Sequence, residues 1–169
     1  MSKDVDFEEQ QQFLLMGVQK ARDLGNSIDQ QINILVGISS AIFLYSISQY
    51  VAYHELAHLS LTLFMGLAML LSIITIHPFR WMRRRGQKES VFYNRFVVKQ
   101  ESPVEYGKIL DAVVVNRDAL INEYATEVYN LYKYYYRPKR DLYLQTRNVF
   151  SLGIVLTIAI VVIQMLFQF

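Results

Sequence analysis

Three long stretches without charged residues constrain the fold of this chain more than any other feature. They cover residues 32–52, 59–76 and 149–169, and none of them contains Lys, Arg, Asp or Glu. A helix needs about 20 mostly apolar residues to cross a hydrocarbon core roughly 30 Å thick. The sequence therefore predicts an all-α membrane protein with three transmembrane helices. Any ligand chemistry should lie in the water-exposed segment before the third span.

The spans divide the chain into four predicted parts that differ in their surroundings. Two parts are embedded in lipid, and two are helical segments on the cytoplasmic side. The cytoplasmic amphipathic helix covers residues 1–31, the transmembrane hairpin 32–76, the long-helix cytoplasmic segment 77–148 and the third transmembrane helix 149–169.

The segment before the first span has the pattern of an amphipathic helix. Its apolar residues alternate at spacings of four and three and continue into the lipid, which predicts one helix from about Asp6 to Tyr53. Gly25 and its polar neighbours are the point at which this helix could bend. The apolar stripe consists of Leu14, Val18, Ala21, Gly25, Ile28, Ile32 and Leu35.

A second long helix is predicted within the cytoplasmic segment. Ser102, Pro103 and Glu105 form a capping-box start, and the helical pattern continues to about Arg137. Pro138 should kink or break the helix there, because the residue before a proline disfavours the α conformation. Its apolar stripe consists of Leu110, Val113, Ile121, Tyr124, Val128, Leu131 and Tyr135.

The distribution of basic residues predicts the orientation of the spans. Lys and Arg collect on the cytoplasmic side of membrane proteins. The turn at residues 53–58 has none, whereas basic residues follow the second span and precede the third. The prediction is a multi-pass protein with a cytoplasmic N-terminus and a C-terminus outside. The basic residues that follow the second span are Arg83, Arg84, Arg85 and Lys88, and those that precede the third span are Arg137, Lys139, Arg140 and Arg147.

Composition excludes several functional classes. The chain has no cysteine, which rules out disulfides, thiolate metal sites and thiol catalysis. A net charge of +2 does not indicate a nucleic-acid-binding protein. The sequence also lacks a glycine-rich phosphate loop and a Ser-His-Asp set. We therefore expect no enzymatic activity, no metal cofactor and no nucleic-acid partner.

His54, Glu55 and His58 match the HExxH pattern of zinc proteases, which is the enzymatic alternative. That pattern places two imidazoles on one face of a helix, with the glutamate as general base. Here the five residues form the outer turn between two spans, and His77 lies at the opposite end of the second span. A polar turn is the favoured interpretation, with a zinc-dependent membrane protease as the alternative.

Basic and aromatic residues of the cytoplasmic segment form a candidate ligand site. Aromatic rings next to cations can stack on a base and hold a phosphate. The same residues could instead be a topology signal and a membrane-proximal aromatic belt. The candidate ligand-binding residues are Arg84, Arg85, Arg95, Lys133, Tyr134 and Arg137.

Polar side chains in or near the spans suggest contacts between helices. Such groups usually face a partner helix or a water-filled path. They could make simple hydrogen bonds between helices or line a pore in an assembly, and Gly37 with Ala41 offers a small-residue packing motif. We predict a homo-oligomeric helical bundle, and a ligand-free structural oligomer is a further alternative. The polar residues are Asp29, Asn33, Thr157, Gln164 and Gln168.

Several short motifs in a fixed order resemble the transmembrane effector family of Pycsar antiphage systems. No single motif is decisive, and the resemblance covers about residues 13–165. The motifs are Ala21-Arg22-Asp23-Leu24, residues 29–35, His77-Pro78, Ser90-Val91-Phe92-Tyr93, Glu105-Tyr106, Asp118 with Leu120-Ile121, and residues 127–131.

The resemblance implies a role for the chain. Family members are membrane effectors of the bacterial inner membrane that are paired with a nucleotide cyclase. Phage infection triggers synthesis of a cyclic pyrimidine mononucleotide, cUMP or cCMP, and the effector then impairs membrane integrity in an abortive infection. The implied partners are the lipid bilayer, further copies of the chain and the cyclic nucleotide. The implied function is a nucleotide-responsive defence effector.

Overall fold

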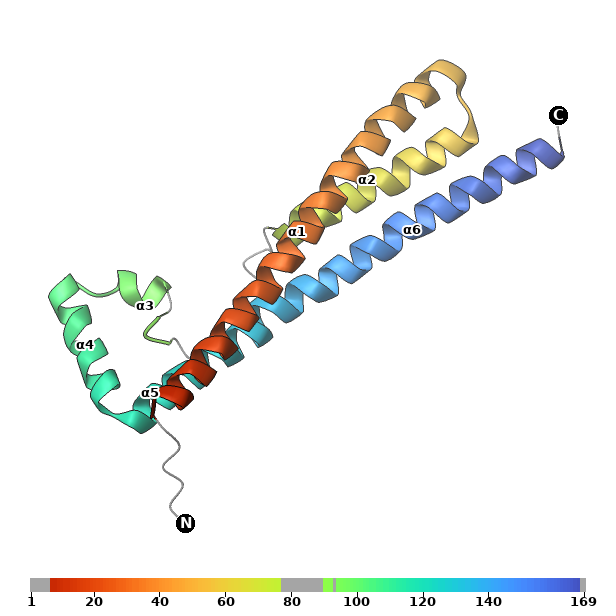
Figure 1. Ribbon diagram of the computed structural model, residues 1–169. Coiled ribbons are helices and arrows are strands. Elements are labelled where there is room, and N and C mark those ends of the chain that lie inside the picture. The colour runs from red at the N-terminus through yellow and green to blue at the C-terminus, as the bar shows by residue number, and fades with distance from the viewer. Residues whose placement is uncertain (1–6, 77–89, 93, 168–169) are drawn as a thin grey trace, which may run out of the picture. The chain divides into compact units, whose positions relative to one another are not determined.

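The computed structural model describes residues 7–76, 90–92 and 94–167, and the side chains of residues 7–10, 94 and 95 are not described. This part of the chain is helical and contains no strand (Figure 1). Three of its helices are long and apolar enough to cross a membrane, which confirms the predicted all-α fold with three spans. The helices are α1 (Phe7–Tyr53), α2 (Leu56–Ile76), α3 (Asn94–Val98), α4 (Pro103–Val115), α5 (Arg117–Asn130), the π-helix η2 (Leu131–Tyr136) and α6 (Arg137–Leu166).

The chain packs as two compact units, each built from both halves of the sequence. The first comprises residues 1–26 and 83–137, and we call it the hairpin unit after the hairpin of α4 and α5. The second comprises residues 27–82 and 138–169, which include the predicted transmembrane hairpin, and we call it the span unit. Helix α1 contributes its first part to the hairpin unit and the rest to the span unit. The four-part division by membrane surroundings stays a prediction.

The predicted stripe of α1 is the buried face of this helix. Ala21 and Ile32 are each 1% exposed, and Val18, Ile28 and Leu35 are also buried. The helix runs without interruption past Gly25, where the ring of Tyr135 occupies the space that a Cβ would need. The alternating four-and-three spacing of the sequence therefore identified the packed side of the helix.

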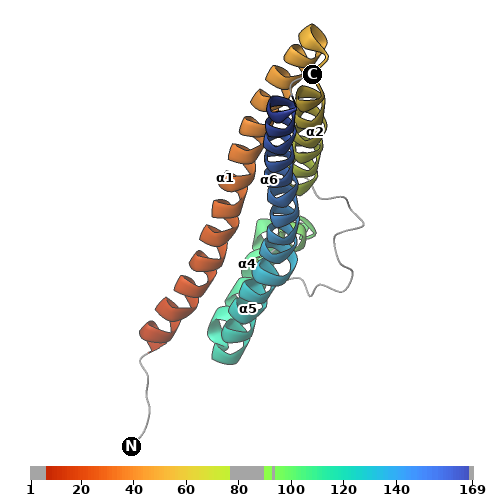
Figure 2. The same cartoon turned by 90° about the vertical axis from the view of Figure 1, so that its right-hand side faces the viewer.

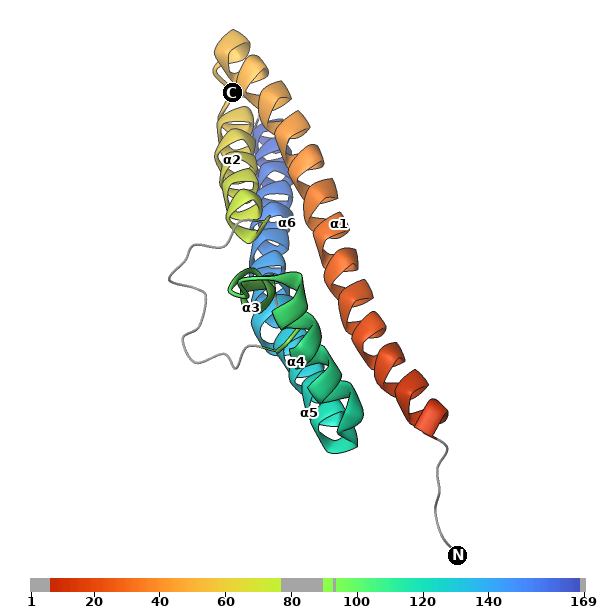
Figure 3. The same cartoon turned by 90° about the vertical axis from the view of Figure 1, so that its left-hand side faces the viewer.

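The span unit is a bundle of three helices held by close approach. The second part of α1, helix α2 and helix α6 lie side by side, as Figure 2 and Figure 3 show from two sides. A Cβ added at Gly153 of α6 would lie 2.4 Å from the Cβ of Phe64 on α2. A Cβ added at Gly66 of α2 would lie 3.1 Å from the ring of Phe43 on α1. Small residues at such contacts let helices pack closely in lipid.

The single helix predicted over residues 103–137 is wrong, because the structure breaks it at Asn116. Helix α4 begins as predicted, with the Ser102 hydroxyl accepting from the Glu105 amide. It ends at Val115, after a run of β-branched valines that favours helix only weakly. The Asn116 side chain then caps α5 by accepting from the amides of Asp118 and Ala119. An internal N-cap of this kind starts a new helix.

The break predicted at Arg137 and Pro138 is also wrong, because the helix continues through both residues. Proline lacks an amide hydrogen, and its ring clashes with the carbonyl four residues earlier in an α-helix. Here the preceding turn is the π-helix η2, in which the Arg137 amide bonds to the Tyr132 carbonyl. This wider turn accommodates the proline, so α5, η2 and α6 form one continuous helix.

Candidate functional site

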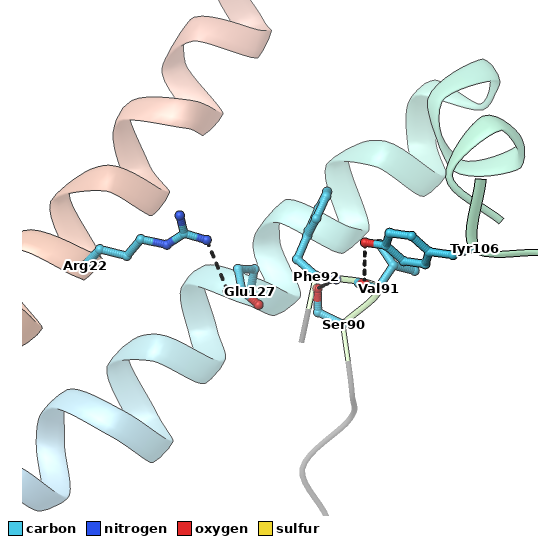
Figure 4. A network of polar contacts seen from close by, with 6 residues as sticks. All are labelled: Arg22, Ser90, Val91, Phe92, Tyr106 and Glu127. Atoms are coloured by element: carbon cyan, nitrogen blue, oxygen red, sulfur yellow. Dashed lines mark hydrogen bonds and ion pairs between the residues drawn. The ribbon is translucent and has the colours of Figure 1, made fainter. Parts of the chain in front are cut away.

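A short segment before α3 is fixed by polar contacts within the hairpin unit. Ser90 is fully buried and Val91 is 6% exposed. The Val91 amide donates to the Glu123 carboxylate at 3.1 Å. The Tyr106 hydroxyl donates to the Val91 carbonyl at 3.1 Å, as Figure 4 shows. Helices α4 and α5 therefore hold both backbone groups of one residue, which defines the position of this segment in the unit.

The next residue of the segment continues the same contact surface. The Phe92 amide donates to the Ser90 hydroxyl at 3.2 Å, which tightens the turn. The Phe92 ring lies 5.8 Å from that of Tyr124 on α5, in a tilted arrangement. The segment therefore joins α5 through aromatic packing as well as through hydrogen bonds.

A buried carboxylate connects α1 and α5 in the hairpin unit. Glu127 is 8% exposed, and its carboxylate lies 3.9 Å from the guanidinium of Arg22 (Figure 4). Asn130, one turn further along α5, is also buried. A buried carboxylate needs a compensating charge, so loss of the nearby guanidinium would destabilise the unit. Predictions from the apolar stripe missed both residues, since the buried side of α5 is partly polar.

A partly exposed aromatic and cationic cluster spans the end of α5 and the start of η2. The Lys133 ammonium lies 4.6 Å from the ring centre of Tyr129 and 5.6 Å from that of Tyr134, and it also bonds to the Tyr129 hydroxyl. Tyr129 is 52% exposed. The cluster presents ring surface and a positive charge together, which suits a planar anionic ligand.

The structure brings together only some of the predicted ligand-binding residues. Lys133 and Tyr134 lie next to each other in the cluster just described, and Arg137 follows at the first position of α6 with an exposed side chain. Arg95 belongs to α3, but its side chain lies outside the described part of the chain. Arg84 and Arg85 lie outside the described residues altogether.

The residues of the HExxH pattern do not share a helix. Helix α1 ends at Tyr53, His54 adopts a left-handed backbone conformation with φ of 55°, and α2 begins at Leu56. Glu55 lies 3.4 Å from His58, within hydrogen-bonding reach of the imidazole. Among the described residues, no three His, Cys, Asp or Glu side chains are grouped as metal ligands would be. The geometry is that of a turn between two spans.

The polar residues predicted in the spans have different surroundings. The Asp29 carboxylate pairs with Lys139 at 2.6 Å within the span unit. The Thr157 hydroxyl donates to the Gly153 carbonyl of its own helix at 2.8 Å. Asn33 and Gln164 are exposed, and Gln168 lies outside the described residues.

Sequence reasoning missed a set of buried hydroxyl groups inside the span unit. The Thr62 and Ser46 hydroxyls are 3.0 Å apart and join α2 to α1. Ser39 and Ser72 are also buried, and neither hydroxyl has a hydrogen-bond partner in the described part of the chain. The four-and-three spacing of α1 continues from Leu35 to Ser39 and Ser46 and could have located those two.

A comparison with known protein families identifies the family of this chain. The family model of the Pycsar effector protein domain matches residues 13–166, which is nearly the whole chain. No curated protein and no solved structure matches it. Val91, Tyr106 and Glu127, which belong to the motifs that suggested this family, are held in the contacts of the hairpin unit described above. The chain therefore belongs to the Pycsar effector family, and it is a membrane protein that acts as an effector of antiphage defence.

Proposed function

We propose that this effector responds to a cyclic pyrimidine mononucleotide, cUMP or cCMP, and then impairs the integrity of the bacterial inner membrane. Infected cells stop growing or die before phage is released. The protein acts as an assembly of identical chains, without enzymatic activity and without a metal cofactor. The N-terminus lies in the cytoplasm and the C-terminus outside.

One observation carries this proposal: the cluster of Tyr129, Lys133 and Tyr134 lies on a helix that continues unbroken into a membrane span. The π-helix that holds Lys133 and Tyr134 is followed directly by α6. A ligand at the cluster therefore acts on the same helix that crosses the lipid. It shifts the balance between two states of the assembly only as far as it binds one of them more tightly.

The chemistry of the cluster fits a cyclic nucleotide. A pyrimidine base has a flat face that stacks on a tyrosine ring, which contributes about 1–3 kcal/mol per base. The cyclic phosphate carries one negative charge, which the Lys133 ammonium can neutralise. Because that ammonium already lies near two tyrosine rings, charge and ring surface are side by side before the ligand arrives.

Calorimetry on the full chain in lipid nanodiscs tests the binding step. We expect cUMP or cCMP to bind, and Lys133→Met to weaken binding about tenfold or more through loss of one charge-assisted contact. Lys108→Met is the matched control, because Lys108 is an exposed lysine of α4 outside the cluster. Absence of heat with both nucleotides, or equal losses in the two variants, would overturn the binding site.

A membrane assay tests the outcome of binding. In cells that express the effector with its cyclase, infection should depolarise the membrane before lysis, and Lys133→Met should abolish both depolarisation and protection. Protection without any change in membrane potential would contradict the proposed lesion.

Labelling of single cysteines tests the orientation, because the chain has no native cysteine. A membrane-impermeant maleimide should label Glu55→Cys in intact spheroplasts and label Lys108→Cys only after lysis. The opposite pattern would reverse the proposed topology.

A further inference from the structure

Helix α1 has a second stripe at heptad spacing, on the side opposite to its buried stripe. Its residues alternate at intervals of three and four along the whole helix, and every one of them is exposed. Two helices pack side by side when apolar residues repeat at this spacing, and in this stripe the apolar residues lie on either side of the polar run Lys20, Asp23, Ser27 and Gln30. The stripe consists of Phe13, Met16, Lys20, Asp23, Ser27, Gln30, Ile34, Gly37, Ala41, Leu44, Ser48 and Val51.

The stripe begins with two large, exposed apolar residues that precede the first predicted span. Phe13 is 73% exposed and Met16 is 61% exposed, and both precede the first charge-free stretch by more than fifteen residues. Met16 also lines a shallow, open depression together with Gln19, Lys20, Asp23 and Leu24. Large apolar side chains rimmed by polar ones mark a protein interaction surface in water.

The charges of the stripe favour a second copy of this chain as the partner. Lys20 and Asp23 are exposed, and neither has an ion-pair partner among the described residues. Copies inserted in one membrane have the same orientation, so two stripes meet in parallel. Lys20 of each copy then lies one layer from Asp23 of the other, so each lysine can pair with the aspartate of the second copy across the two layers. Charges at such positions also fix the register of the pair.

The second part of the stripe is built for close approach of helices. Gly37, Ala41 and Ser48 are small, and a Cβ added at Gly37 would meet no atom within 4 Å. No contact within the described chain therefore explains the glycine. In lipid, a glycine and an alanine four residues apart let two helices approach closely.

We propose that this stripe of α1 is the surface through which two copies of the chain associate. The inference rests on the proposed assembly of identical chains and names the face that forms it. Parallel contact along α1 joins the water-exposed apolar residues, the complementary charges and the small residues in one continuous interface.

Disulfide formation in membranes tests the face directly, because the chain has no native cysteine. We expect Met16→Cys to form a disulfide-linked dimer on mild oxidation, and Leu15→Cys to form several-fold less. Leu15 is the matched control, since it is 52% exposed and points about 100° away around the helix. Equal yields, or a preference for Leu15→Cys, would overturn the proposed face.

A second pair of variants separates assembly from folding. Gly37→Leu should shift the purified protein in detergent toward the monomer, whereas Gly107→Leu should not, although a Cβ at either glycine meets open space. Lys20→Asp should also weaken association, and the charge swap of Lys20→Asp with Asp23→Lys should restore it. A dimer that persists in Gly37→Leu and Lys20→Asp would contradict this face.

These outcomes are distinct from those of the nucleotide response. Dimers that form through another face, with nucleotide binding intact, would overturn this inference and leave the proposed function unaffected. Dimers through this face without any nucleotide binding would overturn the proposed function alone.

Discussion

The hairpin unit and the span unit are held together by different means. In the hairpin unit, side chains cap α4 and α5, and a tyrosine and a glutamate hold both backbone groups of Val91. In the span unit, helices touch at Gly66 and Gly153, and two buried hydroxyls have no partner in the described part of the chain.

The difference follows from the predicted surroundings of the two units. In water, exposed helix ends need caps, and burial of apolar surface stabilises the fold. In lipid, the surroundings of a helix are as apolar as its neighbours, so association depends on close packing and on bonds between helices. Substitutions should therefore act through shape in the span unit and through hydrogen bonds in the hairpin unit.

Gly153→Ala should cause the largest loss of stability. The added Cβ would lie 2.4 Å from the Cβ of Phe64, an atom next to the backbone, so α2 and α6 must move apart. We expect a cost of about 1–3 kcal/mol, which is typical of overpacking. The measurement is SDS-induced unfolding of the purified protein in mixed micelles.

Gly25→Ala of the hairpin unit is the matched control for this prediction. Its Cβ would lie 2.5 Å from the edge of the Tyr135 ring, and Tyr135 is 37% exposed, so its side chain can shift more easily than a backbone-proximal Cβ. The loss should be clearly smaller than for Gly153→Ala. Equal losses would show that shape constrains both units alike.

The pair of Asp29 and Lys139 should show the strongest coupling between two side chains of the span unit. Their charged groups are 2.6 Å apart, and the Lys139 side chain is only 11% exposed. A double-mutant cycle with Asp29→Asn and Lys139→Met should give a coupling of about 1–3 kcal/mol, because each single variant leaves one charge without this partner. Additive losses in unfolding would show that the pair contributes little to the bundle.

Tyr106→Phe should lower the stability of the protein, whereas Ser72→Ala should not. The first removes the hydroxyl that donates to the buried Val91 carbonyl, and should cost about 1 kcal/mol. The second removes a buried hydroxyl with no hydrogen-bond partner in the described part of the chain, and should be neutral or stabilising. Hydrogen exchange at the Val91 amide should rise in Tyr106→Phe alone.

Tyr53→Phe is the control for this pair, because Tyr53 is 66% exposed and should tolerate the loss of its hydroxyl. A loss of stability in Ser72→Ala would mean that its hydroxyl makes a bond in the membrane after all.

The sequence predicted the helices far better than their contacts. The spans, the long first helix and its buried face from Val18 to Leu35 all follow from hydrophobic spacing, which acts along one helix. The continuous helix through Pro138 depends on a π turn, which no spacing rule indicates.

The candidate site was predicted only in part for a similar reason. Lys133 and Tyr134 are neighbours in the sequence, so their type and position were enough to find them. The contacts of Val91 with Tyr106 and Glu123 join three separate segments, and they follow from the break at Asn116 that sequence reasoning placed elsewhere.

Substitutions of His54, in the turn after α1, should change the stability of the protein least. This helix end has a left-handed residue where α4 and α5 of the hairpin unit have side-chain caps. His54 ends α1 in a left-handed conformation, and its ring lies 5.7 Å from that of Tyr50. His54→Gly removes about 1–2 kcal/mol of backbone strain and loses a ring contact worth about 0.5–1.5 kcal/mol, so the net change should be within about 1 kcal/mol.

His54→Ala is the matched variant, because it loses the same ring contact and keeps the strained Cβ. It should be less stable than His54→Gly by about 1 kcal/mol. Both variants should protect cells from phage as well as the parent chain does, since a turn between two spans needs no imidazole. Loss of protection in both, with folding intact, would instead point to chemistry at His54 and favour the zinc protease.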